Sequence, residues 1–406
     1  MGKRELLLVL GFAVVGTIVY QFTARPAAEG EPRFSLSTVI DHFRRGVRGN
    51  RATAETTTHA DYPVSDETSE LRVSFDKGSA ETLTITGEDR EDVSSELHVW
   101  SNGFDDAEAE RYARATVLKG TEAGGRLSFG LTFPREARQR ANITLHVPRK
   151  MRISIARYSG KLAITGTRDV ELLDSRGEAT VRDITGRVAV SHRGGDLNIA
   201  DVATIKLTVR GADVRIARVR GDLTVQAQAG ELTASELEGA VDIESNNTEV
   251  TLDRLDATKS PIHVTATNGS VKINGARTDT RIDARNAEVT VSLARPTTLA
   301  VYADGGEQVE VTPAPGGFQL DAVTNGGGRI SVPDKLGDSK IAVKVEDAEQ
   351  RASGVVNGGG PMITVRATHG EIVLRTPDSV RMPEAPEPPK PPAPPRPPKL
   401  SKLESR

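Results

Sequence analysis

The side chains best suited to chemistry in this sequence are its histidines and carboxylates. The seven histidines lie at positions 42, 59, 98, 146, 192, 263 and 369. None belongs to an HExxH motif or pairs with another at ligand spacing, so the sequence gives little support for a zinc site. Ser191 and His192 are adjacent, but a catalytic triad is defined by side chains that meet in space, so adjacency alone does not predict one.

Carboxylates recur at the starts of predicted strands, at Glu178, Asp196, Asp213, Asp222, Glu231, Glu249 and Glu288. In a stack of repeats they would line one edge and could bind calcium, as the Gly/Asp repeats of toxin-type β-rolls do. That motif interleaves two aspartates with glycines in each nonapeptide, and the GGDL at 194–197 supplies only a fragment. We therefore favour the alternative in which these residues cap turns and keep the edge soluble. We predict no catalytic, cofactor-binding or metal-binding residues.

Composition excludes further classes of chemistry. The chain of 406 residues has no cysteine, which excludes disulfides, thiolate metal sites and cysteine nucleophiles. Its 53 basic and 56 acidic residues are interspersed, so no nucleic-acid footprint is expected. The glycine runs at 326–328 and 358–360 lack the GK[ST] ending of a phosphate loop and are read as loop hinges.

The N-terminus predicts attachment to a membrane. Lys3 and Arg4 precede an apolar run over residues 6–22, which is near the short limit for crossing a bilayer. Since Pro26 occupies a position where a cleavage site needs a small residue, we expect a signal anchor over 1–24, with a cleaved signal peptide as the alternative. Lys3 and Arg4 favour export of the bulk of the chain to the periplasm or cell surface, although Arg25 and Arg33 argue the other way.

The flanking segments are read as connector and tail. Residues 25–61 form a predicted juxtamembrane connector, with apolar residues at helical spacing over 36–47 beside Arg44, Arg45 and Arg48. This short amphipathic helix would either lie on anionic lipid or dock on its own domain. Residues 53–58 are read as flexible linker. The tail at 378–406 is proline-rich, with ten prolines among residues 383–398, and we expect it to be a semi-rigid spacer rather than a ligand for a partner.

From Leu71 the hydrophobic period changes to two, which predicts strands. Alternating segments lie at 71–75, 83–85, 97–99, 127–133, 143–147, 153–155 and 162–164. Asp76-Lys77-Gly78 predicts a turn that joins the first two segments in a hairpin. Residues 105–118 fit either a helix or a strand pair, and both interpretations stay open.

Between residues 160 and 293 three sets of residues recur with a period of about 18. The first set is small and marks turns: Gly160, Gly177, Gly195, Ala212, Gly230, Thr248, Gly269 and Ala287. The second is apolar: Val170, Val188, Ile205, Leu223, Val241, Ile262 and Ile282. The third is Val181, Ile199, Ile216, Ala234, Leu252, Ile273 and Val291. Apolar residues at a fixed period predict about eight stacked two-strand repeats, with irregular strands at 71–155 and 296–377 capping the two ends.

Three passages resemble the toastrack domain family, whose members are also described as bacterial "putative adhesin" β-strand-repeat proteins. They are ITLHVPRKMRISIARYSGKLAITG, GDLTVQAQAGELTASELEG and the closing VVNGGGPMITVRATHGEIVLR. The resemblance covers residues 62–377. It implies an all-β stack, often attached to a membrane segment in bacterial envelope proteins, and it brings no catalytic residues.

These observations predict an all-β, β-solenoid-like or β-roll-like stack of two-strand repeats over residues 62–377, preceded by one membrane helix. For function we expect a non-enzymatic, membrane-anchored envelope protein that scaffolds or senses through its repeat surface, with an envelope protein as partner and no cofactor. A surface adhesin or ligand-binding module is the alternative. A polysaccharide-active β-helix enzyme ranks third, because such enzymes have longer coils and clustered charges, and Trp100 is the only tryptophan available as a sugar platform.

Overall fold

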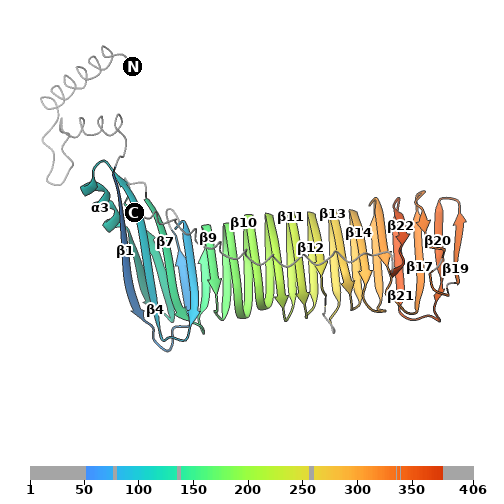
Figure 1. The fold of residues 1–406 in the computed structure, drawn as a ribbon, viewed down its shortest axis with the longest axis horizontal. Coiled ribbons are helices and arrows are strands. Elements are labelled where there is room, and N and C mark those ends of the chain that lie inside the picture. Colours follow the sequence, from blue (N-terminus) through green and yellow to red (C-terminus); the bar gives the residue numbers. More distant parts are fainter. Residues whose placement is uncertain are drawn as a thin grey trace, which may run out of the picture.

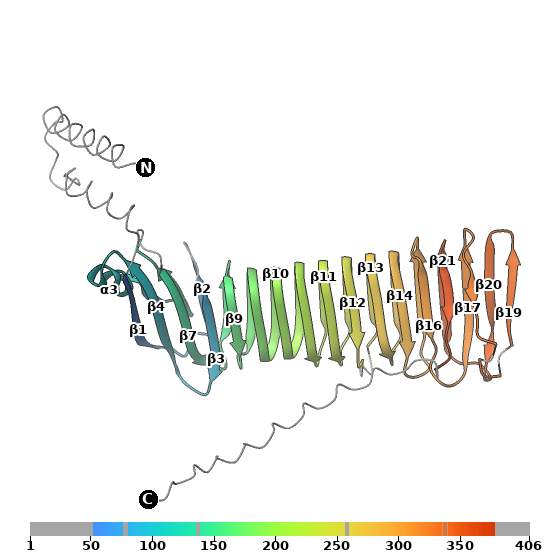
Figure 2. The same ribbon diagram turned by 45° about the horizontal axis from the view of Figure 1, so that its top comes forward.

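The computed structural model describes residues 52–377, except 76–79, 135–138, 256–259, 335 and 339. This part of the chain is almost entirely β-strand, with one α-helix, so the prediction of a mostly β protein is confirmed. Figures 1 and 2 show an extended stack in which successive strands lie side by side along one long axis.

The middle of the stack is built from parallel strands that wind as successive coils. They are β10 (Asp169–Val219), β11 (Leu223–Leu237), β12 (Val241–Asp253), β13 (Ile262–Ala276) and β14 (Thr280–Leu293). Leu223 pairs with Ile205, Val241 with Leu223, and Ile262 with Val241. Each strand therefore hydrogen-bonds to the coil before it and the coil after it, which satisfies backbone groups that a single coil would leave unpaired.

Each coil has two strand-like sides joined by two tight corners, as residues 223–240 illustrate. Side one runs over 223–228 and ends at corner one, where Ala229 and Gly230 have φ of 60° and 106°. Side two follows and ends at corner two, where Glu236 has φ of 57°. Alternate residues of both sides point inward, as Val225 and Leu232 do, and form one continuous apolar core along the stack.

The periodic columns expected from the sequence lie where they were predicted, with one error. Val241 stacks on Leu223, and Leu252 on Ala234, both in the core. Ile282 was assigned to the wrong column, because it stacks on Val264 whereas Thr280 stacks on Ile262. Thr280 is buried and its hydroxyl donates to the carbonyl of Thr278 at 3.0 Å, so a polar residue fills an inward position and the hydrophobic pattern misleads.

At the N-terminal end the coils follow a different order in space from their order in sequence. The strands concerned are β2 (Glu70–Ser74), β3 (Thr82–Glu88), β6 (Arg126–Thr132), β7 (Gln139–Pro148), β8 (Arg152–Ala156) and β9 (Ser159–Thr165). The coil of β2 and β3 lies between the coil of β6 and β7 and the coil of β8 and β9, with every pairing parallel. The predicted hairpin of residues 71–85 is therefore wrong, because β2 and β3 are consecutive sides of one coil; residues 76–78 themselves lie outside the described residues.

The outer layer of this end consists of β4 (Asp92–Gly103), which pairs with β7, and β1 (Ala52–Pro63), which pairs with β4. The domain therefore begins ten residues before its predicted start, and residues 53–58 form strand rather than linker. Residues 105–118 resolve into helix α3 (Asp106–Ala115) and the start of β5 (Val117–Ala123). Helix α3 packs on β1 and β4, and its N-cap Asp105 accepts the backbone N–H of Glu108 at 2.8 Å.

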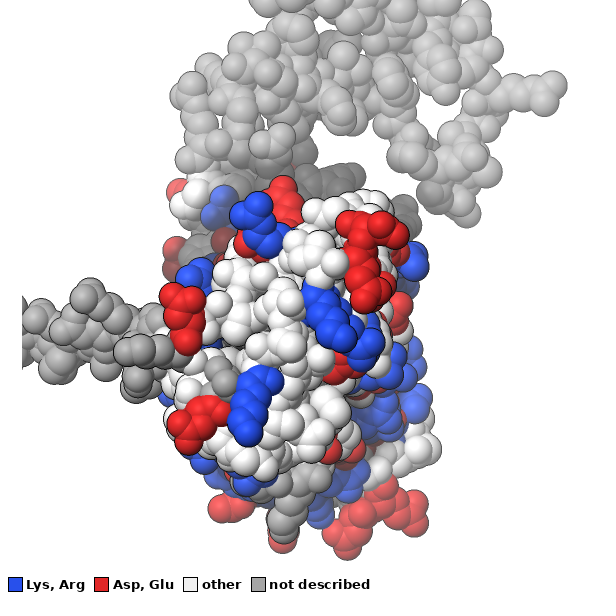
Figure 3. All heavy atoms as spheres, turned by 90° about the vertical axis from the view of Figure 1, so that its right-hand side faces the viewer, with Lys and Arg blue, Asp and Glu red and all other residues white. Residues whose placement is uncertain are grey.

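The C-terminal end repeats this exchange of order. Its strands are β15 (Leu299–Asp304), β16 (Gln308–Thr312), β17 (Phe318–Asn325), β18 (Ile330–Ser331), β21 (Met362–Thr368) and β22 (Glu371–Leu374). The coil of β21 and β22 is inserted between the coil of β15 and β16 and that of β17 and β18. Two antiparallel strands, β20 (Glu349–Val356) and then β19 (Lys340–Glu346), finish the sheet, and Figure 3 views the molecule from this end. Both predicted caps thus continue the parallel stack before they become irregular.

The predicted anchor at 1–24, the connector up to residue 51 and the proline-rich tail at 378–406 lie outside the described residues. Among the helices of the described part, none is both long and apolar enough to span a bilayer.

Candidate functional site

Corner two carries a column of charged residues that runs along the stack. The column consists of Gly166, Asp183, Asp201, Arg218, Glu236, Arg254 and Gly275, all with positive φ. Five of these seven positions hold a charged side chain in the left-handed region, which ordinary residues adopt only at a cost. Since each lies two residues after the inward column that contains Val181 and Ile216, the same backbone turn recurs in coil after coil.

A buried residue directly after each corner-two position fixes this turn; it is Thr167 after Gly166 and an apolar residue in the six later coils. The apolar residues form a third inward column: Ile184, Val202, Val219, Leu237, Leu255 and Ala276. Because their side chains are buried, the residues before and after them, such as Arg218 and Arg220, project to the outside. Corner two therefore displays two parallel rows of outward-facing side chains on a backbone that the core holds in place.

The two rows line an open hollow of about 780 Å³, which we call the corner-two groove. Its lining residues are Arg149, Asp183, Thr185, Asp201, Arg218, Arg220, Glu236, Glu238 and Arg254. Four are arginines and four are carboxylates, so the groove has no net charge, but its sign changes along its length: it is negative at the coils of Asp183 and Asp201, positive at that of Arg218, negative at that of Glu236 and positive at Arg254. Such a surface suits a partner that carries charges of both signs.

Ion pairs between neighbouring coils order these side chains. Arg218 binds Asp201 through two contacts, from Nε to Oδ1 at 2.5 Å and from Nη2 to Oδ2 at 2.7 Å. Arg254 Nη1 lies 2.8 Å from Glu236 Oε1. The hydrogen bonds from Arg218 hold the pKa of Asp201 below its ordinary value, with Arg182 and Arg220 adding to the effect. Asp201 therefore stays ionised throughout the physiological pH range.

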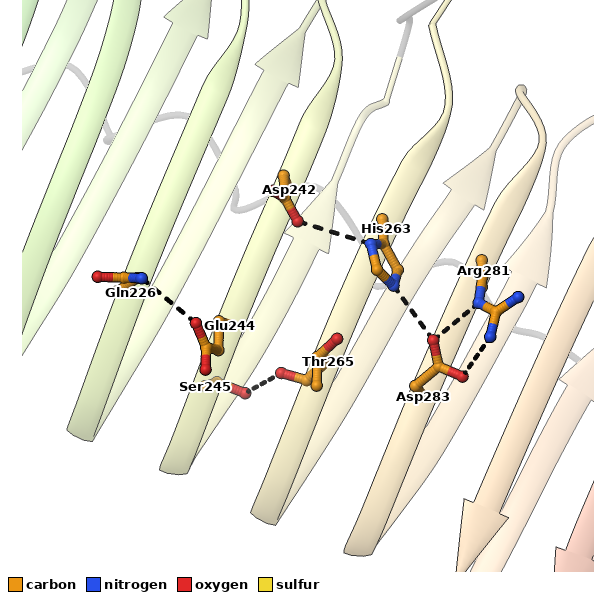
Figure 4. Close-up of polar contacts among 8 residues, drawn as sticks. All are labelled: Gln226, Asp242, Glu244, Ser245, His263, Thr265, Arg281 and Asp283. Carbon is orange, nitrogen blue, oxygen red and sulfur yellow. Dashed lines mark hydrogen bonds and ion pairs between the residues drawn. The ribbon is translucent and has the colours of Figure 1, made fainter.

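A second polar surface covers the outer face of side one, where Figure 4 shows contacts that cross successive coils. His263 lies 3.6 Å from Asp242 and 3.1 Å from Asp283, and Arg281 contacts both carboxylate oxygens of Asp283 at 2.8 and 3.0 Å. Hydrogen bonding to Arg281, with a smaller effect of His263, lowers the pKa of Asp283. The hollows on this face, of about 370 and 440 Å³, are smaller than the groove, which makes this surface a weaker candidate.

Six of the seven carboxylates considered for calcium share one column at the start of side two, where each directly follows the small residue of corner one: Glu178, Asp196, Asp213, Glu231, Glu249 and Glu288. Ser270 interrupts this column between Glu249 and Glu288. Asp222 instead lies at the start of side one and accepts the backbone N–H of Ala240 in the next coil at 3.1 Å. Asp213 accepts that of Glu231 at 3.3 Å. Asp213 and Asp222 thus cap turns, and within the described ranges no group of three or more histidines and carboxylates could hold a metal.

His192 does not act with its neighbour Ser191. Its Nδ1 lies 2.9 Å from the hydroxyl oxygen of Ser175 in the preceding coil, and that hydroxyl donates to the carbonyl of Ser191 at 3.3 Å. Ser175 and His192 are 2 % and 1 % exposed, so no substrate reaches this pair. Burial lowers the pKa of His192 below its ordinary value, and the imidazole is therefore a neutral part of the core.

The sequence reading overlooked the corner-two groove, although its signal was available. The charged column and the apolar column after it repeat at the same intervals as the columns that were recognised. The charged residues of this column look like ordinary solvated surface in the sequence. Their left-handed backbone conformation is seen only in the structure. His192 and the carboxylates are candidates because of their residue types, whereas the residues of the groove are recognised only by their position within each coil.

Comparison with known families fits this architecture. Residues 69–240 match the family model described as Toastrack DUF4097. The chain contains a toastrack domain. The match to the toastrack model runs from the start of β2 to just beyond β11, and so includes the exchange of coil order at the N-terminal end and much of the groove. A search of curated proteins gave no match.

Several solved structures are similar to this chain at low identity. One, from Parabacteroides distasonis and described as a "putative lipid binding protein", is 13 % identical and has a TM-score of 0.29, with 65 % of this chain and 97 % of the other covered. A "putative adhesin" from the same organism is 11 % identical, with a TM-score of 0.29 and coverage of 64 % and 97 %. A "putative cell adhesion protein" from Clostridium sporogenes is 10 % identical, with a TM-score of 0.17 and coverage of 80 % and 100 %.

Proposed function

We propose that this protein is a non-enzymatic, membrane-anchored component of a bacterial envelope whose β-solenoid-like stack is a scaffold or sensing module. The stack would bind an envelope protein through the corner-two groove. The observation that carries this proposal is the recurrence of exposed or half-buried charged side chains at one offset in five successive coils, from Asp183 to Arg254. A rigid backbone that presents charges at regular intervals can select a partner by charge order, at little entropic cost to itself.

Site-specific photo-crosslinking in cells tests the groove. A photoreactive residue at Glu238 lies in the groove, whereas one at Gln228 lies in the same coil beside corner one, and both positions are exposed. We expect a defined protein adduct from position 238 and none from position 228. Reversing two groove charges, with Arg218→Glu and Arg220→Glu, should abolish the adduct. If the adduct forms equally at both positions, or survives the reversal, the groove is not the binding surface.

The membrane anchor and the export of the domain rest on the apolar run at 6–22 and the basic residues before it. Reporter fusions placed after residue 60 would give the side of the membrane. Fluorescence or activity of a reporter that works only in the cytoplasm would contradict export.

The two alternative functions predict different results. A surface adhesin should be cut when protease is added to intact cells, whereas a domain enclosed by an outer membrane should be protected. A polysaccharide-active enzyme should degrade acidic polymers and lose that activity when clustered carboxylates are neutralised. The capping roles of Asp213 and Asp222 favour a structural use of these carboxylates over catalysis.

A further inference from the structure

The C-terminal end of the stack leaves a core-facing apolar strip without cover. Val343 in β19 is in register with Ala352 of β20, which is in register with Ala322 of β17. Both alanines are fully buried, so Val343 lies on the side of the sheet that faces the core. No further coil of the described residues covers this side, and Val343 and Val345 are 49 % and 63 % exposed.

The backbone edge of β19 is open as well. Within the described part of the chain, β19 pairs with β20 on one side and with no strand on the other. An unpaired edge presents a row of N–H and C=O groups that another strand can use. Its residues from Lys340 to Glu346 contain no proline, and its core-facing row is Ile341, Val343 and Val345 with no inward charge to oppose pairing.

The opposite end of the stack is protected by the usual means. Its outermost strand, β1, exposes Glu55, His59 and Asp61 and ends at Pro63. His59 lies 3.3 Å from Glu96, and helix α3 packs on the strand. Charges, proline and a covering helix all discourage edge pairing. The N-terminal end is therefore protected against pairing with another strand, whereas β19 is not.

The end view in Figure 3 agrees with this contrast. Uncharged atoms occupy the centre of the C-terminal face, and lysine, arginine and carboxylate side chains gather at its rim. A centre depleted of charged residues, with charged groups towards its edge, is usual for a protein interface.

We propose that β19 is the docking edge for a second copy of this chain, and that two copies join end to end through antiparallel pairing of their β19 strands with Val343 opposite Val343. This register places Lys340 opposite Glu346 of the second copy at both ends of the pair, and Ile341 opposite Val345 of the second copy. Opposite charges and matched apolar residues directly across an antiparallel pair stabilise it.

Other registers fit less well. Centring the pair on Ala342 would place Lys340 opposite Lys344 of the second copy, and like charges across a pair repel. A shift by one residue would set Val343 against Lys344 of the second copy and mix the apolar and charged faces. In the favoured register the two apolar rows lie on the same side of the continuous sheet, where Ile341, Val343 and Val345 of each copy would contact those of the other.

A two-fold axis through Val343 would make the two sheets continuous and set the β1 ends at opposite extremities of the dimer. The interface is isologous, since the same strand serves both copies, and it closes at two copies rather than growing into a filament. The proposal does not depend on the groove or its partner.

Disulfide trapping tests the register. The chain has no cysteine, so single-cysteine variants of the full chain report cleanly. Facing residues in antiparallel strands have Cα atoms about 4.5–5.5 Å apart, which suits a disulfide. Val343→Cys should give a disulfide-linked dimer under mild oxidation. Val117→Cys, equally exposed at 50 % but near the N-terminal end, is the matched control and should stay monomeric. Equal crosslinking of the two variants would overturn the proposal.

Sedimentation of the full chain tests the affinity and the charge pairing. We expect a dimer at concentrations of about 100 µM, the range of a weak standard interface. Val343→Lys should weaken dimerisation at least tenfold without changing the melting temperature, and Val117→Lys should not affect it. Lys340→Glu should weaken the dimer, and adding Glu346→Lys to that variant should restore it. A monomeric wild-type chain, or a double variant that is not restored, would contradict the proposed pairing.

Discussion

Corner one and corner two both require a residue with positive φ in every central coil, yet they select different residue types. At corner one these residues are Gly194, Gly211, Ala229, Asn247, Asn268, Asn286 and Gly305. At corner two they are mainly Asp, Arg and Glu. The corners also differ in their surroundings, because the residue after the corner-one turn lies in close backbone contact with the preceding coil, whereas corner two opens onto the groove.

This contrast indicates that packing between coils restricts the residue types at corner one, whereas corner two can hold side chains used for binding. At corner one the residue after the turn is crowded: a Cβ at Gly195 would overlap the carbonyl oxygen of Gly177, and one at Gly230 would overlap that of Ala212. At corner two a long side chain such as Arg218 fits, because it projects away from the coil. A corner that accepts any side chain able to bear the left-handed backbone can be varied for binding without harm to the stack.

The largest effect should come from filling corner one. Gly195 has φ of 83° and no space for a Cβ, so Gly195→Val combines a disfavoured backbone with overlap onto a neighbouring backbone. We expect destabilisation of about 3–5 kcal/mol. The measurement is the shift of the urea midpoint, read both by circular dichroism and by hydrogen exchange of the coils near residue 195, since repeat stacks need not unfold in one step.

The matched control lies in the next coil of the same corner. Gly211 has φ of 61°, a Cβ added there would meet no atom within 4 Å, and asparagine holds the equivalent place at 247, 268 and 286. Gly211→Asn should therefore change the midpoint little. Equal losses for Gly195→Val and Gly211→Asn would mean that backbone conformation alone, and not crowding, distinguishes the corners.

A pH-dependent effect of intermediate size should come from His192, which is buried just before corner one. Because burial lowers its pKa below the ordinary value of about 6.5, the unfolded chain takes up a proton before the folded chain does as the pH falls. Its stability contribution is thus complete above pH ~6.5 and declines below that. The melting temperature should fall between pH 7.5 and 5, and less steeply in His192→Asn.

Val190→Ala is the control for this titration. Val190 is buried two residues before His192, so its truncation should lower the melting temperature but leave the pH dependence of the wild type, because no titratable group is removed. If His192→Asn melts with the same pH dependence as the wild type, the buried imidazole is not the group that links stability to pH.

The repeat length, the small-residue column of corner one and two of the apolar columns could be read from the sequence because each depends on burial or on glycine, which constrain residue type strongly. Thr280 shows the limit, since a buried threonine looks like surface and displaced Ile282 by two residues. The corner-two column is not predicted because its residues are neither buried nor restricted to glycine. Asp183 and Arg218 are ordinary surface types, and only the periodicity of the buried residues after them reveals their position.

The exchange of coil order at both ends could not be predicted from periodicity. The coil of β2 and β3 has the same alternating pattern as any other, and its place between β6–β7 and β8–β9 is decided by strand pairings more than 50 residues apart. The local pattern around Asp76-Lys77-Gly78 favoured a hairpin, because turn residues indicate that the chain bends and do not indicate which strand it meets next.

A smaller effect should follow from relaxing corner two. Asp183 has φ of 54°, and glycine occupies the equivalent place at 166 and 275. Asp183→Gly removes the strain of a left-handed backbone from the folded state. It also increases the conformational entropy of the unfolded chain, and the two effects on the free energy of unfolding nearly cancel. We expect the free energy of unfolding to change by less than about 1 kcal/mol. A loss as large as that of Gly195→Val would show that corner two is as constrained as corner one.

The smallest effect on stability should come from the charges themselves. Arg218 pairs with Asp201 at two contacts, yet its side chain is 52 % exposed, and exposed ion pairs often contribute nothing measurable to folding. Arg218→Gln should leave the melting temperature unchanged at both low and high salt, while it weakens the adduct formed from position 238. Arg193→Gln, which removes the pair with Asp174 outside the groove, should change neither. If Arg218→Gln lowers the melting temperature at low salt but not at high salt, the ion pairs stabilise the stack. The charged residues of the groove would then serve folding rather than binding.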